Sequence, residues 1–368
     1  MKKKIIFYHP YFGDGGVEKT NLKISEKLSK QYDIFFLSHS FSNKFNKEIK
    51  RIGIKKILIP SKRSIFAFME IVRFYKKTKP DLIFSLQTHA NVISLLLNMF
   101  FFQNKLKVIC CERISIKRYE WNLKGRLIII LAKLIYRYSK LVICNSKELS
   151  KEFKALSKNL KVIHIYNPTL NTNFNFLSKK FKIKTEPFIN KNKPILFSLG
   201  RLDYNKNNIM LLRAYNKIKD KIRCNIVLMG DGNEKNMLLD YAKKNNFEKN
   251  FFIFSFQKNP YPYFSKSDIL ILTSRTEGLP NVLIEALALK KFVISTKCPT
   301  GPKEILLNGK AGFLVNNDDY EDLANKIRIY FQKPEIVKKK KKNIKKSLLQ
   351  FSPVKSLNKY QEIVDNII

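Results

Sequence analysis

The stretch from Pro80 to Glu112, PDLIFSLQTHANVISLLLNMFFFQNKLKVICCE, holds two short apolar runs with a longer one between them. The outer runs, LIFSL and VICC, are short and uninterrupted by charge, which is typical of strands buried on both faces of a sheet. The central run, ANVISLLLNMFFF, is long enough for a helix. A strand, a helix and a second strand in this order predict a unit with two parallel strands.

The same alternation continues on both sides of this stretch. Before it the predicted strands are KKIIFYHP, YDIFFLS and KKILIP, and after it LVICNSK. The alternation restarts in the second half with PILFSLGRL, CNIVLMGDG, NFFIFSF, ILILTSR, KFVISTK and AGFLV. We therefore expect an α/β protein with two Rossmann-like doubly wound domains, which face each other across a cleft at the carboxyl ends of their strands.

The length of the chain agrees with two domains. At 368 residues it exceeds what a single hydrophobic core typically supports. The polar, Asn- and Lys-rich stretch 171–193 is the predicted linker, so that the N-terminal domain covers residues 1–180 and the C-terminal domain residues 190–352. Residues 353–368 form a predicted amphipathic helix that packs back on the first domain.

The chain is strongly basic, with 71 Lys+Arg against 29 Asp+Glu and a formal net charge of +42. Such a charge implies attraction to polyanions, which include nucleic acid, an anionic membrane leaflet and phosphorylated substrates. A biased base composition of the source genome is the alternative explanation for the many lysines. The dense run Lys338–Lys342 is interpreted as a solvated helix face rather than as a binding patch.

The cysteines and the lengths of the apolar runs indicate where in the cell the protein works. Five cysteines without a CxxC pair indicate reduced thiols in a cytoplasmic protein. No apolar run reaches the roughly 18 residues that span a bilayer, so we expect any membrane contact to be peripheral, on an anionic surface. The apolar segment 125–140, GRLIIILAKLIYRYSK, with basic residues at both ends, either lies in the membrane interface or is a buried helix.

Three loops at predicted strand ends carry groups that suit a nucleotide. After the first strand, residues 13–16, GDGG, form either an ordinary turn or an anion site at a helix start. After PILFSL, Arg201 and Lys206 suit a diphosphate, because Arg binds two oxygens at once and Lys supplies a mobile point charge. After CNIVLM, the Gly-Asp-Gly turn 230–232 is explained by turn chemistry alone or forms a wall for a nucleotide base.

The segment Thr276–Leu287, TEGLPNVLIEAL, places two carboxylates around a predicted helix start at Pro280. Amides in the first helical turn lack helical partners and form an anion site, here those of Asn281, Val282 and Leu283. Glu277 before the helix and Glu285 inside it accept hydrogen bonds only, so both suit sugar hydroxyl groups. The alternative is a surface glutamate and a second one placed by the helix dipole.

The order of these motifs is more specific than any one of them. A Gly-Gly loop is followed by GRLDYNKN, GDG, EGLPNVLIEA and CPTGPKEIL. This order resembles the retaining nucleotide-sugar glycosyltransferases of family 4, which have the GT-B fold of two Rossmann-like domains. The resemblance covers nearly the whole chain and is strongest from Leu199 to Val315, where Glu277 and Glu285 reproduce the family's E-x7-E spacing.

The resemblance implies a role for each motif. Arg201 and Lys206 would neutralise the leaving diphosphate and, with Glu277, act as the catalytic residues. Glu277 would bind a hydroxyl of the donor sugar, and Glu285 the ribose of the nucleotide. The remaining donor contacts would come from Gly15, Gly16, Gly230, Gly232, Gly278, Leu279, Pro280, Asn281, Val282 and Leu283.

The resemblance also implies the substrates. The enzyme would move a hexose or N-acetylhexosamine from a nucleotide diphosphate sugar to a glycan or polyprenyl-diphosphate-linked acceptor, in cell-surface polysaccharide or glycoprotein assembly. It would need no metal and no other cofactor. The N-terminal domain would bind the acceptor, with His89, Glu112 and Arg113 on the acceptor side, and the C-terminal domain would bind the nucleotide sugar. Many relatives have a histidine where this chain has Glu112 and Arg113, so Glu112 either contacts the acceptor or forms a structural ion pair, and His89 is alternatively a satisfied helix-start histidine.

Two other functions remain open at the level of sequence. A nucleotide-sugar epimerase shares the two-domain architecture. A basic module that binds nucleic acid or a membrane surface explains the charge, but it does not explain the ordered motifs at strand ends. The chain also lacks the aromatic residues interleaved with basic ones that RNA-binding modules carry, so we expect no specific nucleic acid partner.

Overall fold

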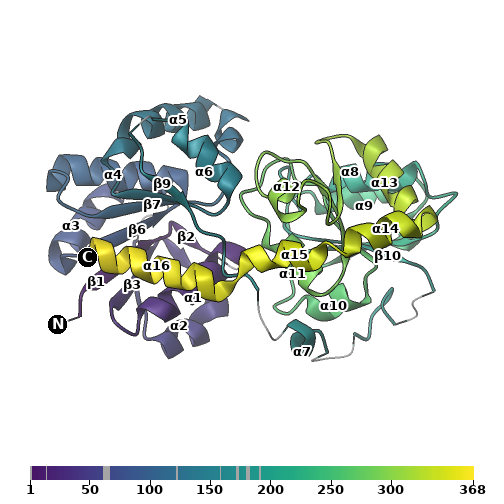
Figure 1. The fold of residues 1–368 in the computed structure, drawn as a ribbon, viewed down its shortest axis with the longest axis horizontal. Helices are drawn as coiled ribbons and strands as arrows, with labels where there is room; N and C mark the ends of the chain where they lie inside the picture. The colour runs from purple at the N-terminus through teal and green to yellow at the C-terminus, as the bar shows by residue number, and fades with distance from the viewer. Residues whose placement is uncertain are drawn as a thin grey trace. The chain divides into compact units, whose positions relative to one another are not determined.

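A computed structural model describes residues 2–13, 15–60, 67–121, 123–157, 159–170, 174–179, 183–189 and 192–368. The chain divides into two compact units, one of Met1–Pro168 with Pro353–Ile368 and one of Thr169–Ser352 (Figure 1). The division at Thr169 precedes the predicted limit at residue 180. The predicted linker includes a short helix, α7 (Phe174–Lys179), that contacts α10 (Tyr261–Lys266) of the second unit. Residues 171–173, 180–182 and 190–191 of this linker lie outside the described residues.

The first unit is built on a parallel sheet that has seven strands within the described residues. In spatial order they are β5 (Lys55–Leu58), β3 (Asp33–Ser38), β1 (Lys4–Tyr8), β6 (Leu82–Leu86), β7 (Val108–Glu112), β8 (Leu141–Cys144) and β9 (Val162–His164). The chain runs from β1 outward through β3 to β5, and then returns to β6 on the other side of β1. The strand order therefore reverses between β1 and β6, which is where open α/β sheets bind ligands.

Helices cover both faces of this sheet, because its central strands carry apolar side chains on both faces. Along β1, Ile5 and Phe7 pack on one side with Tyr360, whereas Ile6 and Tyr8 pack on the other with Ile71. The first face carries α1 (Gly16–Leu28), α2 (Asn46–Ile52) and α16 (Pro353–Ile367), and Figure 1 shows α16 beside α1. The second face carries α3 (Phe68–Thr78), α4 (Thr88–Phe102), α5 (Leu123–Ile135) and α6 (Lys147–Lys154).

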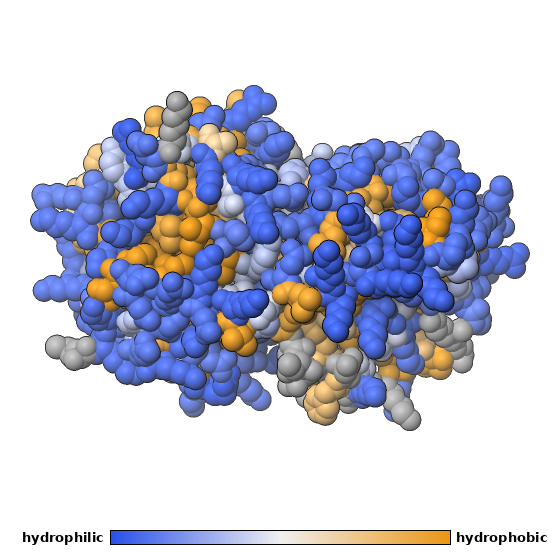
Figure 2. All heavy atoms as spheres, in the orientation of Figure 1, coloured by the Kyte–Doolittle hydropathy of each residue, from blue (hydrophilic) through white to orange (hydrophobic). Residues whose placement is uncertain are grey.

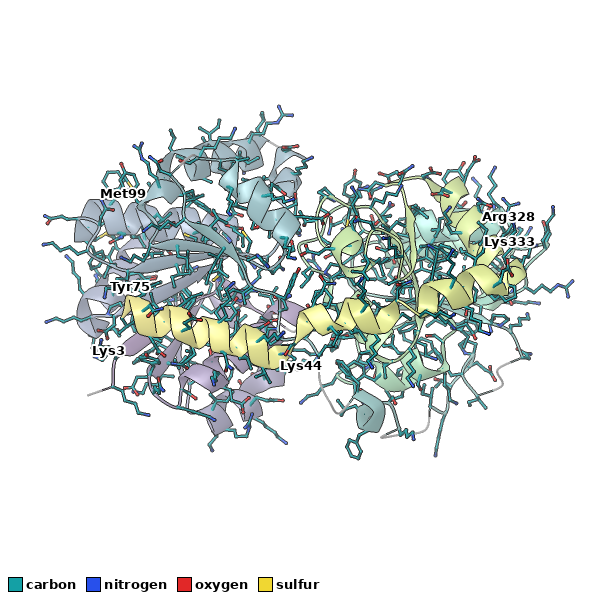
Figure 3. All side chains as sticks on the ribbon, in the orientation of Figure 1. Lys3, Lys44, Tyr75, Met99, Arg328 and Lys333 are labelled. Carbon is teal, nitrogen blue, oxygen red and sulfur yellow. The ribbon has the colours of Figure 1, made fainter. Side chains whose placement is uncertain are left out.

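The C-terminal helix α16 belongs to the first unit although it follows the second unit in sequence. Its Tyr360 and Val364 are buried in the first unit's core. The two ends of the chain also meet there: the ammonium group of Lys3, which Figure 3 labels, donates to the carbonyl oxygen of Ile368 over 2.8 Å.

The second unit repeats the same plan with a six-stranded parallel sheet in its described part. The order is β12 (Phe251–Phe254), β11 (Asn225–Met229), β10 (Ile195–Leu199), β13 (Ile269–Leu272), β14 (Phe292–Thr296) and β15 (Phe313–Val315). One core cluster contains residues of α8 (Asn208–Asn216), α9 (Lys235–Lys244), α13 (Tyr320–Gln332) and α14 (Pro334–Lys341). Here the strand order reverses between β10 and β13, so the predicted doubly wound fold is confirmed in both units.

The remaining elements are short. They are β2 (Tyr11–Phe12) and β4 (Ser40–Phe41), which pair with each other, α11 (Asn281–Ala288), α12 (Pro302–Ile305) and α15 (Ile344–Leu348), and the 3₁₀ turns Asn43–Phe45, Ile116–Trp121, Tyr136–Tyr138, Glu248–Asn250 and Leu349–Phe351. Lys338–Lys342 lies at the end of α14 with mostly exposed side chains, as expected of a solvated face. All five cysteines are buried free thiols.

Hydrophilic side chains cover most of the face drawn in Figure 2. Among the described helices, none is both long enough and apolar enough to cross a bilayer.

Candidate functional site

Two loops of the second unit follow the neighbouring strands β10 and β13, and hydrogen bonds join them. The side-chain oxygen of Asn205 accepts from the amide and the hydroxyl of Thr276 over 3.1 and 2.7 Å, and its amide group donates to the Thr276 carbonyl over 3.1 Å. The amide of Arg275 donates to the Asn205 carbonyl over 2.8 Å. These bonds fix the loop that carries Lys206 against the loop that carries Glu277.

Lys206 and Glu277 form an ion pair at this junction. The ammonium nitrogen of Lys206 lies 2.6 Å from Oε1 of Glu277, and both side chains are largely buried, at 19% and 13% exposed. The hydroxyl of Ser274 donates to the same carboxylate oxygen over 2.7 Å. The structure thus brings together two predicted site residues that are far apart in the sequence.

Arg201 lies on the same loop as Lys206 but points to solvent. Its side chain is 63% exposed and pairs with Asp203 over 3.0 Å. Because an exposed guanidinium on a long side chain can turn, its part in binding a diphosphate stays a prediction.

Gly230 and Gly232 bring the loop after β11 against the loop after β10. A Cβ on Gly230, whose φ is +147°, would lie 1.9 Å from the carbonyl oxygen of Gly200, and a Cβ on Gly232 would lie 2.1 Å from that of Leu202. No side chain fits at either position. The structure gives both glycines a packing role, and their contact with the donor stays a prediction.

Helix α11 begins directly after Pro280, which is its N-cap. The amide of Leu283 donates to the Pro280 carbonyl over 3.1 Å, so the prediction that this amide lacks a partner was wrong. The first turn of the helix is tight, so the amide bonds to the carbonyl three residues earlier. An ideal α-helix would leave this amide without a partner. The amides of Asn281 and Val282 stay predicted donor contacts, as do Gly278 and the buried Leu279.

Glu285 lies half-buried on α11 and accepts a hydrogen bond from the hydroxyl of Tyr261 on α10. Burial, and then the nearby carboxylate, raise the pKa of the Tyr261 phenol, which therefore stays protonated as a donor. The sequence analysis missed Tyr261, because a tyrosine in the apolar segment NPYPYFSK carries no distinguishing signal.

In the first unit, Gly15 is the N-cap of α1 and Gly16 its first residue. The carboxylate of Glu18 folds back over this loop and accepts from the amide of Gly13 over 3.1 Å. A Cβ on Gly15 would lie 2.9 Å from the other oxygen of Glu18. The space at this helix start is therefore shared with a carboxylate, and Asp14 lies outside the described residues.

Glu112 is fully buried at the end of β7 and accepts from Thr88 over 2.9 Å, from Asn91 over 2.7 Å and from Tyr136 over 2.5 Å. Burial raises the pKa of Glu112 to about 7 despite these bonds. Through Thr88 and Asn91 the carboxylate fixes the first turn of α4, which carries His89. Glu112 therefore influences the position of His89 through these two residues. The three donors to Glu112 are neutral groups, whereas the structural alternative was predicted as an ion pair, and contact of Glu112 with the acceptor stays a prediction.

Arg113 is also buried, at 9% exposed. Its guanidinium donates to Asn167 over 2.7 Å and to the hydroxyl of Tyr360 on α16 over 3.2 Å. This side chain ties the end of β7 to the C-terminal helix. Of the three predicted acceptor-side residues, only His89 is partly exposed.

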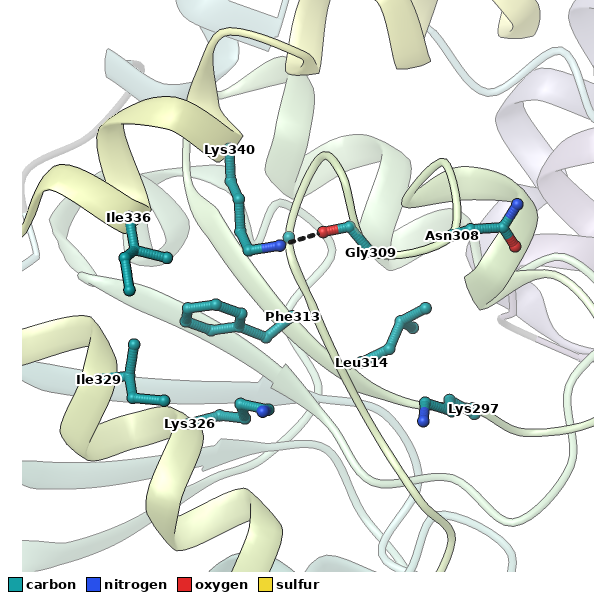
Figure 4. A pocket seen from close by; sticks show the side chains of 10 residues that line it. Lys297, Asn308, Gly309, Phe313, Leu314, Lys326, Ile329, Ile336 and Lys340 are labelled. Carbon is teal, nitrogen blue, oxygen red and sulfur yellow. Dashed lines mark hydrogen bonds between the residues drawn. The ribbon is translucent and has the colours of Figure 1, made fainter. Parts of the chain in front are cut away.

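The site in the second unit combines cations, carboxylates and a helix start at the carboxyl edge of a parallel sheet. Its described residues, like those of the whole chain, include no group of three or more His, Cys, Asp or Glu that could hold a metal ion. A cavity of about 390 Å³ lies elsewhere in this unit, beside Phe313 and Lys340, where Lys340 donates to the Gly309 carbonyl (Figure 4). None of the predicted site residues lines that cavity.

Two family models match the chain. Residues 179–347 match the model described as "Glycosyl transferases group 1", and residues 14–169 match "Glycosyltransferase Family 4".

The chain is also similar to individual proteins over most of its length. It is 30% identical over 312 residues to an uncharacterized glycosyltransferase of Methanocaldococcus jannaschii, covering 77% of this chain and 73% of that one. It is 27% identical over 368 residues to N-acetylgalactosamine-N,N'-diacetylbacillosaminyl-diphospho-undecaprenol 4-alpha-N-acetylgalactosaminyltransferase of Campylobacter jejuni, covering 96% and 97%. The fold is similar to that of Anabaena HepE solved in complex with UDP-glucose, with a TM-score of 0.80, 17% identity and 99% of both chains covered.

Proposed function

The chain belongs to the family 4 glycosyltransferases and is a transferase of two Rossmann-like domains, and from this premise we propose that it moves a hexose or N-acetylhexosamine, with retention, from a nucleotide diphosphate sugar to a lipid-linked glycan. The acceptor would be a growing glycan on polyprenyl diphosphate, in the assembly of a cell-surface polysaccharide or glycoprotein. The Campylobacter relative is named for a transfer to a diphospho-undecaprenol acceptor, which supports this class.

One observation carries the donor assignment. Lys206 and Glu277 lie 2.6 Å apart where the strand order of the second sheet reverses, directly before α11. A cation at this position stabilises a departing diphosphate, and a carboxylate beside it binds a sugar hydroxyl. The UDP-glucose bound in the structure of Anabaena HepE supports a nucleotide sugar as the donor class.

The proposed roles follow the charges. The ammonium of Lys206 and the guanidinium of Arg201 stabilise the negative charge that develops on the leaving phosphate, and amides at the start of α11 add their dipoles. Glu277 positions the transferred sugar, and Glu285, held by Tyr261, binds the ribose. Glu277 bonds directly to Lys206, so a sugar hydroxyl bound by Glu277 would be coupled through this ion pair to the leaving group.

A screen of nucleotide sugars tests the proposal. Purified protein is incubated with UDP-, GDP- and ADP-linked hexoses and N-acetylhexosamines, each with and without a polyprenyl-diphosphate-sugar acceptor. We expect nucleotide diphosphate release that depends on the acceptor, and a product longer by one sugar. Conversion of a nucleotide sugar without an acceptor and without nucleotide release would instead identify an epimerase.

We further propose that the enzyme works as a cytoplasmic protein on the surface of an anionic membrane, through α5. The outward face of this helix carries Leu123, Leu127, Ile130 and Leu134, which are 81%, 56%, 54% and 57% exposed. Apolar side chains at this spacing form one stripe, and exposed cations such as Lys124 and Lys133 flank it. Apolar atoms reach the surface in this part of the first unit (Figure 2).

The double substitution Leu127→Asp/Ile130→Asp should lower binding to anionic vesicles by tenfold or more. Burial of each side chain contributes roughly 1.5–3 kcal/mol, and both positions are exposed, so folding should persist. Flotation with phosphatidylcholine vesicles, with and without phosphatidylglycerol, measures the effect. The matched control is Met237→Asp/Leu239→Asp, two exposed apolar residues of α9 in the second unit. Equal recovery of the parent with neutral and anionic vesicles, or none with either, contradicts the proposal.

Chelation of divalent metal ions should leave the chemical step unchanged, because Lys206 and Arg201 supply the positive charge that a metal would otherwise provide. Turnover is measured with EDTA in large excess over trace metal ions, and again after manganese is added. Loss of activity with EDTA and its recovery with manganese would refute this part of the proposal.

A further inference from the structure

Two buried hydroxyl side chains that directly follow β13 bond to the ion pair of the second unit. Thr273 and Ser274 are 2% and 0% exposed. The hydroxyl of Thr273 donates to the backbone carbonyl oxygen of Lys206 over 2.9 Å, and the hydroxyl of Ser274 donates to Oε1 of Glu277 over 2.7 Å. Because both side chains are buried, any part that they have in the reaction is exerted through Lys206 and Glu277.

The two oxygens of the Glu277 carboxylate have different surroundings. Oε1 accepts from the ammonium group of Lys206 over 2.6 Å and from the hydroxyl of Ser274 over 2.7 Å. Both groups act as donors, because a carboxylate beside an ammonium group only accepts. Oε2 has no partner among the described residues and is not fully buried, in a side chain that is 13% exposed. The carboxylate therefore presents one bonded oxygen and one oxygen that a ligand can reach.

Ser274 sets the plane of this carboxylate. A lysine ammonium is a compact charge with three hydrogens on a flexible stem, so Lys206 alone would pair with either oxygen or with both. The hydroxyl of Ser274 has a single hydrogen, and it meets one oxygen only. Rotation of the carboxylate away from this arrangement breaks the bond to Ser274, and a half turn merely exchanges two equivalent oxygens. One oxygen is therefore held at the cation, and the other is kept available.

The backbones of Ser274 and Glu277 are themselves fixed by side chains from the next loop. The hydroxyl of Thr296, the last residue of β14, donates to the Ser274 carbonyl over 2.7 Å. The hydroxyl of Thr300 donates to the Glu277 carbonyl. Thr296 and Thr300 are 0% and 2% exposed, so both bonds are shielded from water. The Ser274 hydroxyl thus has a fixed point from which it orients the carboxylate.

The backbone and the stem of Lys206 do not depend on Ser274 for their place. The amide of Lys206 donates to the carboxylate of Asp203 over 3.0 Å, and its carbonyl accepts from Thr273. The alkyl stem of Lys206 packs over Gly200, where a Cβ would lie 3.2 Å from Cε of the lysine. Loss of the Ser274 hydroxyl would therefore release the carboxylate of Glu277 and leave the lysine in position.

We propose that Ser274 is a positioning residue of the transfer, whose hydroxyl keeps one oxygen of Glu277 on Lys206 and the other turned toward a hydroxyl of the donor sugar. The proposal rests on the glycosyl transfer proposed above, and it deepens it by naming the group that orients Glu277. Ser274 does not touch the substrate. It fixes the carboxylate before the sugar arrives, so that the contact to the sugar needs no reordering as the diphosphate departs.

Ser274→Ala should lower turnover by about tenfold or more and leave the affinity for free nucleoside diphosphate unchanged. The sugar contact loses its orientation, whereas the phosphates meet Lys206 in its place. Steady-state kinetics uses the nucleotide sugar that the parent turns over in the screen above, and calorimetry uses the corresponding nucleoside diphosphate. Ser274→Cys nearly keeps the volume but offers only a weak donor. It should show the same loss of turnover with a melting temperature closer to that of the parent, which separates the hydrogen bond from packing.

The matched control is Ser267→Ala, at the other end of β13. Ser267 is 1% exposed, and its hydroxyl donates to the carbonyl of Phe264 over 2.8 Å. Its removal deletes one buried serine hydroxyl from the same unit and should leave turnover unchanged.

A double variant separates positioning from a merely structural role. Glu277→Ala removes both oxygens, so Ser274→Ala added to it should cost no further turnover, whereas a structural defect would lower turnover by the same factor in either background. An equal loss in both backgrounds, or turnover like the parent in folded Ser274→Ala and Ser274→Cys, overturns this inference and leaves the proposed function standing. If the parent turns over no nucleotide sugar, the proposed function falls, and this inference falls with it.

Discussion

Lys206→Ala is expected to lower turnover by about 10²- to 10³-fold, the usual cost of losing one preorganised group that stabilises developing charge. The structure strengthens this expectation, because Lys206 is held in place by Glu277 at 2.6 Å and by the loop bonds of Asn205. An ammonium fixed before reaction does not need to be ordered when the diphosphate departs. Steady-state kinetics with the nucleotide sugar, at saturating acceptor, measures the effect.

The loss of Lys206 also leaves the largely buried carboxylate of Glu277 without its cation. Lys206→Met retains the alkyl stem that packs over Gly200, and comparison of its melting temperature with that of Lys206→Ala separates folding from catalysis. The matched control is Lys217→Ala, which breaks an exposed ion pair to Glu321 at 3.5 Å and should leave turnover unchanged. Turnover near that of the parent in folded Lys206→Ala would place the cation outside the site.

Glu277→Gln and Glu285→Gln should fail in different ways. If Glu285 binds the ribose, its substitution weakens binding of the free nucleotide diphosphate as well as of the full donor. If Glu277 binds the transferred sugar, its substitution leaves the affinity for free nucleotide almost intact and lowers turnover, because a contact that positions the reacting carbon matters most in the transition state. Each lost charged hydrogen bond should cost roughly 1.5–3 kcal/mol. Calorimetric titration with nucleotide, beside steady-state kinetics with the donor, distinguishes the two.

The ion pair between Lys206 and Glu277 leads to a second expectation, for the double variant. Because Glu277 bonds directly to Lys206, the losses from Lys206→Ala and Glu277→Gln should not add in the double variant. Glu321→Gln, in the exposed pair with Lys217, is the control for removing a carboxylate elsewhere in the same unit. If both glutamate variants bind nucleotide and turn over like the parent, these acids are a structural ion-pair partner and a partner of Tyr261, and the donor assignment falls.

The sequence by itself determined the fold and the edge at which the chemistry lies. Largely apolar strands of three to six residues that alternate with helices are typical of a parallel sheet covered on both faces. In such a parallel sheet every strand has its carboxyl end at the same edge, so the loops at Lys206 and Glu277 had to lie at that edge, and the pairing of β10 with β13 then brings them together. The spacing from Glu277 to Glu285 was equally readable, because it is set within one loop and one helix.

Only the tertiary structure decided which partner each of these groups has. Side-chain periodicity fixes the face of an element on which a residue lies, but the group that meets it comes from another element. Thus Glu112, predicted with the acceptor side, is enclosed by Thr88, Asn91 and Tyr136, and Glu285 is held by Tyr261.

The same limit applies to α5 and to three histidines that follow neighbouring strands of the first sheet, His9 after β1, His39 after β3 and His89 after β6. The sequence of α5 is apolar on nearly every side, so its pattern left a membrane face and a buried helix equally open, and packing on α4 decided that Leu127 and Ile130 face outward. His9, His39 and His89 carry no spacing that links them. They meet because β1, β3 and β6 are neighbours in the sheet, and a strand order that places the first strand in the middle is a property of the folded chain rather than of any segment of it.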